Sequence, residues 1–159
     1  MWFSRKQVVK SAPDGITKVA VAGAMKVAQA MPKQVTTKSQ GDAAESAARA
    51  YLVRAGLKFV EANYRTPGRG GGEIDLVMRA RDGTLVFVEV RQRSGASHGG
   101  AAASISAVKQ QRIVFAARHY LMRFASLPPC RFDVVLVQGA LREGLDARIE
   151  WLSAAFDAS

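Results

Sequence analysis

The chain has 159 residues, enough for one domain with a hydrophobic core, and it contains no run of about 18 apolar residues that could cross a membrane. A single cysteine, Cys130, excludes an internal disulfide, and one cysteine with two separate histidines excludes the usual zinc sites. The formal net charge is +10, which favours an anionic partner such as nucleic acid. We expect a cytoplasmic protein without membrane contact.

Residues 1–40 differ in composition from the rest of the chain. They hold seven lysine and arginine residues against one aspartate. Residues 16–31 have the apolar spacing of a basic amphipathic helix, although Gly23 in the middle disfavours it. No compact apolar region follows the charged start, so we expect no secretory signal. We interpret residues 1–40 as a basic N-terminal extension, flexible or partly helical, and residues 41–159 as the functional domain.

The first elements predicted after this extension are a helix and a strand. Apolar residues recur at helical spacing from Asp42 to Ala55, and Gly56 is a typical C-terminal stop. Residues 58–64 are typical of a strand, and residues 66–72 of a flexible glycine-rich loop.

A β-hairpin is predicted next. Residues 72–77 and 85–91 each alternate between polar and apolar side chains. The Asp82-Gly83 dipeptide between them is a strong turn signal. The two segments therefore form antiparallel strands in this prediction.

The last predicted elements are a helix and two strands. The helix would be capped by Ser104 or Ser106 and would be stopped by Pro128. Residues 132–137 are typical of a buried strand, and residues 148–152 of an edge strand. The order of elements predicts a central mixed β-sheet flanked by helices, in the α/β class.

Alternation within the hairpin gives two carboxylates a common side. It groups Asp75 with Val77 on the first strand and Glu89 with Phe87 on the second. If these sides coincide, Asp75 and Glu89 become neighbours, and like charges on paired strands repel unless a cation compensates. Glu45, one turn into the first helix, could add a third hard oxygen ligand. Mg²⁺ suits such a set, because it takes one or two carboxylates and keeps waters for a substrate phosphate.

Five motifs occur in order between about Gly41 and Val137. They are Gly41-x-x-Ala44-Glu45, Glu73-Ile74-Asp75-Leu76, Val86-Phe87-Val88-Glu89-Val90-Arg91, Lys109, and Arg131-Phe132-Asp133-Val134-Val135. Together they resemble the UPF0102 family, also called the YraN-like proteins. That family is similar to the PD-(D/E)xK nuclease-like fold, and within it to archaeal-type Holliday junction resolvases.

The resemblance implies a restriction-endonuclease-like core and Mg²⁺- or Mn²⁺-dependent hydrolysis of phosphodiester bonds by in-line attack of water. It implies that Asp75 and Glu89 are direct metal ligands and that the backbone carbonyl of Val90 is a further ligand. Glu45 would complete the shell, directly or through water.

One position departs from the pattern of that fold. The usual lysine of the (D/E)xK motif is Arg91 here, and arginine cannot act as a general base near neutral pH. Three interpretations stay open. In the first, Arg91 stabilises charge while the metal activates water unaided. In the second, a lysine elsewhere substitutes, and Lys109 on the long helix is the best candidate. In the third, activity has been lost.

Other residues have simpler interpretations. Glu73 pairs with an arginine such as Arg65 or Arg93, with a site role as the alternative, and Asp133 forms a structural salt bridge with Arg131. Cys130 is interpreted as a small buried hydrophobe. The aromatic residues expected in the core are Phe115, Tyr120 and Phe124. Individually weak candidates for phosphate contacts are Arg65, Arg69, Arg93 and Arg112.

Two functions are carried forward from the sequence. The first is a metal-dependent endonuclease acting on DNA, branched or structured rather than sequence-marked, because no element resembles a recognition helix for base edges. Junction resolution would need two active sites and hence a homodimer. The second is a catalytically weak or inactive nucleic-acid-binding module of a repair, recombination or uptake complex. A protein-interaction domain that uses the basic extension is a weaker third possibility.

Overall fold

The computed structural model describes residues 36–93, 105–139 and 148–158. The predicted amphipathic helix at residues 16–31 and the alternative cap Ser104 lie outside these residues. Within the part that is described, no helix is both long enough and apolar enough to cross a membrane.

The first helix, α1, spans Thr37–Arg54 and begins five residues before the predicted start at Asp42. The reason is its cap. The Thr36 side chain accepts a hydrogen bond from the Ser39 main-chain N–H at 3.2 Å, which satisfies a donor that would otherwise be unpaired. The first turns of α1 are polar and exposed, so the apolar spacing used for the prediction did not detect them. Gly56, with φ +102°, follows the end of the helix.

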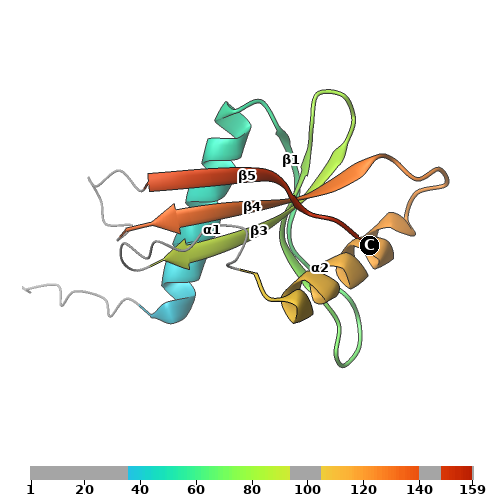
Figure 1. Ribbon diagram of the computed structural model, residues 1–159, viewed down its shortest axis with the longest axis horizontal. Coiled ribbons are helices and arrows are strands. Elements are labelled where there is room, and N and C mark those ends of the chain that lie inside the picture. The colour runs from blue at the N-terminus through green and yellow to red at the C-terminus, as the bar shows by residue number, and fades with distance from the viewer. Residues whose placement is uncertain (1–35, 94–104, 140–147, 159) are drawn as a thin grey trace, which may run out of the picture. The chain divides into compact units, whose positions relative to one another are not determined.

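Five strands form one mixed sheet in the order β1-β2-β3-β4-β5 (Figure 1). Neighbouring strands are antiparallel except for β3 and β4, which are parallel and are joined by the crossover that contains α2. The predicted α/β architecture with a mixed sheet is therefore confirmed. The elements are β1 (Lys58–Arg65), β2 (Glu73–Arg79), β3 (Leu85–Arg93), α2 (Ala107–Leu121), β4 (Cys130–Gln138) and β5 (Arg148–Phe156).

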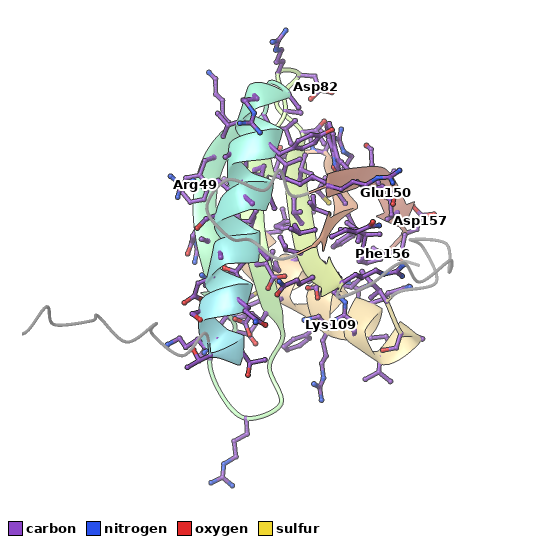
Figure 2. All side chains as sticks on the ribbon, turned by 90° about the vertical axis from the view of Figure 1, so that its left-hand side faces the viewer. Arg49, Asp82, Lys109, Glu150, Phe156 and Asp157 are labelled. Atoms are coloured by element: carbon purple, nitrogen blue, oxygen red, sulfur yellow. The ribbon has the colours of Figure 1, made fainter. Side chains whose placement is uncertain are left out.

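The two helices cover opposite faces of the sheet (Figure 2). On one face, Ala48 and Leu52 of α1 pack in a cluster with Leu76 and Val88 of the hairpin. On the other face, Val77 and Phe87 of the hairpin pack in a second cluster with residues of α2, which are Ile113, Ala117 and Tyr120. Consecutive hairpin residues thus point to opposite helices, as the period of a strand requires.

Helix α2 is capped by Ser106, whose side chain accepts from the Lys109 N–H at 3.3 Å, and it ends at Leu121, before the proline pair expected to stop it. Two packing predictions were wrong. Cys130 is exposed at the first residue of β4, and Phe115 is 54% exposed on the outer face of α2. Tyr120 is buried and Phe124 is partly buried in the core, as predicted.

Candidate metal centre

The hairpin brings two carboxylates together where its ladder ends. The last main-chain pair of β2 and β3 is Leu76 with Val88, and Asp75 and Glu89 are the next residue on each strand. Beyond that pair, the Val90 N–H donates to Asp75 Oδ2 at 2.8 Å. A side chain therefore takes a donor that a continued ladder would use, and the charge of Asp75 raises the pKa of Glu89.

Glu89 is the most buried charge in this group. Its side chain is 3% exposed, and Lys109 Nζ lies 3.2 Å from Oε2 while Arg91 Nη1 lies 3.7 Å from Oε1. The Lys109 contact is an ion pair, and Oε2 accepts no hydrogen bond. A buried carboxylate oxygen that accepts no hydrogen bond is unusual in a folded protein.

Burial and mutual repulsion both disfavour a second negative charge here. Burial and then the charge of Asp75 raise the pKa of Glu89 to about 7, although Lys109 opposes both. Burial also raises the pKa of Asp75, against the lowering effects of the Val90 N–H and of Lys109. Two carboxylates that resist ionisation together, with one buried oxygen that accepts no hydrogen bond, fit a divalent cation such as Mg²⁺.

Glu45 lies beside this pair but does not join it. Within the residues that the structure describes, no group of three or more His, Cys, Asp or Glu side chains is placed to hold one metal ion. Glu45 lines a neighbouring pocket of about 230 Å³ together with Leu76 and Asn63. Burial and the nearby charge of Asp75 raise the pKa of Glu45, so the two carboxylates interact electrostatically.

Asp133 shows what a structural buried carboxylate looks like in this fold. It is completely buried, and it accepts from Arg131 Nε at 3.0 Å, from Trp151 Nε1 at 2.9 Å and from the Ala154 N–H at 3.0 Å. The predicted salt bridge with Arg131 is confirmed. Asp133 thus has hydrogen bonds to both oxygens, whereas Oε2 of Glu89 has only the ion pair with Lys109.

The remaining predicted residues are placed as follows. Glu73 pairs with Arg65, with Arg65 Nη2 2.8 Å from Glu73 Oε1, so one of the predicted phosphate contacts already has a carboxylate partner. Arg69 is exposed in the β1–β2 loop, and Arg112 is exposed on α2. Arg93 is half-buried at the end of β3.

The ion pair of Lys109, which is labelled on α2 in Figure 2, with Glu89 joins the start of α2 to the hairpin. Ser106 fixes where the helix begins, and Ile113, one turn further on, is buried against the sheet. Lys109 is thus directed at the carboxylate pair by the same packing that forms the core. Sequence reasoning missed Asn63, which lies in β1 with a positive φ of 54°, because nothing in a strand-like segment signals a left-handed residue.

These features define an α/β protein with a five-stranded mixed sheet, one helix on each face, and a buried carboxylate pair next to two cations. The chain belongs to the UPF0102 family. The model described as "Uncharacterised protein family UPF0102" matches residues 44–137, a range that includes Glu45, Asp75, Glu89 and Lys109. The family membership predicted from the motifs is confirmed.

Several UPF0102 proteins are similar to this chain over most or all of its length. One from Polaromonas naphthalenivorans (strain CJ2) is 76% identical, and one from Polaromonas sp. (strain JS666 / ATCC BAA-500) is 73% identical, both over the whole of each chain. One from Albidiferax ferrireducens is 60% identical over 84% of this chain and 99% of its own length.

Proposed function

We propose that this protein is a metal-dependent endonuclease that hydrolyses phosphodiester bonds in DNA, with a restriction-endonuclease-like core in residues 41–159 and a cytoplasmic location. The observation that carries the proposal is Oε2 of Glu89, which is buried beside Asp75, forms no hydrogen bond and has Lys109 as an ion-pair partner. Asp133, the other buried carboxylate described, differs from Glu89 because both of its oxygens accept hydrogen bonds.

In this proposal the residues of the chain have separate tasks. Asp75, Glu89 and the carbonyl of Val90 would hold Mg²⁺ or Mn²⁺, and Glu45 would support the site through water. The ion, when bound, would supply Lewis-acid polarisation of the phosphate and a more acidic water. Asp75 is oriented for this by the Val90 N–H, which fixes its Oδ2.

Two cations flank the pair and suit the negative charge of a phosphate. Lys109 Nζ is 3.2 Å from Glu89, closer than Arg91 Nη1 at 3.7 Å, and it is also less exposed. In this proposal Lys109 supplies the amine of the usual motif, a role that Arg91 cannot take because arginine stays protonated near neutral pH. Arg91 adds a planar donor for phosphate oxygens. This favours the interpretation in which a lysine from α2 substitutes for the lysine of the usual motif.

The substrate class in the proposal is branched or structured DNA, contacted mainly through its phosphates. The net charge of +10 and the exposed Arg69 and Arg112 support phosphate contacts, which carry no sequence information by themselves. Cutting both strands at a junction would use two copies of the site, so the proposal includes a homodimer.

A cleavage assay tests the proposal. We expect cutting of branched DNA with Mg²⁺ or Mn²⁺, none with EDTA, and loss of cutting but not of binding in Asp75→Ala and Glu89→Ala. Glu73→Ala is the matched control, since Glu73 lies on the same strand as Asp75 but pairs with exposed Arg65. Loss of cutting in Glu73→Ala to the same extent, or cutting by Glu89→Ala, would contradict the assignment.

Arg91 at the motif position supports a second candidate, a nucleic-acid-binding module without turnover. Such a module would bind DNA with strong salt dependence and would not cut it. Its affinity would be unchanged or higher in Asp75→Ala, because a negative charge is removed next to the phosphates. The two candidates therefore differ in cleavage.

A further inference from the structure

Asn63 has a backbone conformation that its strand does not require. Its φ of 54° is in the left-handed region, between Ala62, which pairs with Leu76, and Tyr64, which pairs with Ile74. Asparagine tolerates this region better than most residues, but glycine tolerates it without steric cost. Conformation alone therefore gives no reason for a side-chain amide at this position.

The other described non-glycine residue with a positive φ has an evident reason for it. Ala154, with φ 51°, donates its N–H to the buried carboxylate of Asp133. In that case the residue with the unusual backbone donates a main-chain N–H to a carboxylate. Asn63 has a side-chain amide that can donate to a carboxylate instead.

The carboxylate next to Asn63 is Glu45. Both side chains line the pocket of about 230 Å³ between α1 and the sheet. Burial and the charge of Asp75 raise the pKa of Glu45, and the side chain of Asn63 acts in the opposite direction. The shared pocket places Asn63 on the α1 side of β1, where its amide can reach the glutamate.

We infer that Asn63 is a positioning residue that holds the Glu45 carboxylate toward the Asp75–Glu89 pair through its side-chain amide. This inference rests on the proposed metal-dependent function. Partners that orient the surroundings of a metal site commonly change metal affinity about 10- to 100-fold when they are removed.

Asn63→Gly is the variant that separates the side chain from the backbone. It keeps the left-handed conformation and removes the amide, so the fold should be retained. We expect the dissociation constant for Mn²⁺, measured on the full chain by calorimetry or by electron paramagnetic resonance, to rise about 10-fold. The thermal midpoint of the metal-free protein should not fall.

A double-mutant cycle with Glu45→Gln tests whether Asn63 acts through Glu45. We expect Asn63→Gly to weaken Mn²⁺ binding in the wild-type background and to add little in the Glu45→Gln background, because the group that it positions is already changed. Independent, additive effects of the two changes would overturn the inference.

Two results distinguish its failure from that of the proposed function. If the wild-type chain binds Mn²⁺ and Asn63→Gly binds it equally well, only the role of Asn63 is overturned. If the wild-type chain does not bind Mn²⁺, the metal centre and the role of Asn63 are overturned together.

Discussion

Replacing Glu89 by glutamine should stabilise the metal-free protein above neutral pH. Glu89 is 3% exposed, and burial raises its pKa from 4.5 to about 7. Between these two values the folded state binds more protons at Glu89 than the unfolded state does. The free energy of unfolding therefore falls as the pH rises through this window, and glutamine, which does not titrate, removes the loss.

The size of the effect follows from that shift. Each pKa unit corresponds to about 1.4 kcal/mol, so ionised Glu89 destabilises the folded state by on the order of 3 kcal/mol above neutral pH. That shift already includes the opposing attraction to Lys109. We expect a net stabilisation of roughly 1 to 3 kcal/mol at about pH 8, and a much smaller difference near pH 4.

Urea denaturation in EDTA at these two pH values measures the difference. Glu73→Gln is the matched control, because exposed ion pairs such as Glu73–Arg65 contribute about 0 to 1 kcal/mol. Added Mg²⁺ should stabilise the wild-type protein and have little effect on Glu89→Gln. If Glu89→Gln is instead less stable than the wild type at pH 8, Glu89 is a structural partner of Lys109 and the argument for a metal centre fails.

Three further substitutions test other parts of the structure. Asp133→Asn should destabilise the fold by about 1 to 3 kcal/mol in thermal or urea unfolding, because a fully hydrogen-bonded buried charge is lost, and an unchanged midpoint would refute its structural role. Gly72→Ala should destabilise by about 1 to 3 kcal/mol, since its added Cβ would lie 1.9 Å from the Arg112 carbonyl oxygen, and wild-type stability would show that this approach is not rigid. Arg91→Lys should change the cleavage rate by less than about 10-fold if Lys109 already supplies the amine, whereas a gain of about 100-fold or more, the size typical of restored proton transfer, would show that the native site lacks it.

Local patterns were sufficient for much of the fold and for the centre of the candidate site. The period of two in the hairpin groups Asp75 with Val77 and Glu89 with Phe87, and both apolar residues lie in the cluster under α2. The hairpin turn at Gly83 and the salt bridge of Asp133 were likewise readable from neighbouring residues. Each of these features depends on the conformation of one short segment, which the sequence encodes directly.

Other features depend on contacts between segments that are distant in the chain. Whether Cys130 and Phe115 are exposed depends on which other elements pack against β4 and α2. The apolar character of a side chain does not show whether another element covers it. The approach of Lys109 to Glu89 needs the packing of α2 on the sheet, and the left-handed turn of Asn63 needs the pairing of β1 with β2. The sequence by itself determined which oxygens meet across the hairpin, because alternation is local. Only the tertiary structure decided that Lys109 faces them and that Glu89 Oε2 is buried without a hydrogen bond, because burial and charge pairing come from whole elements packed together.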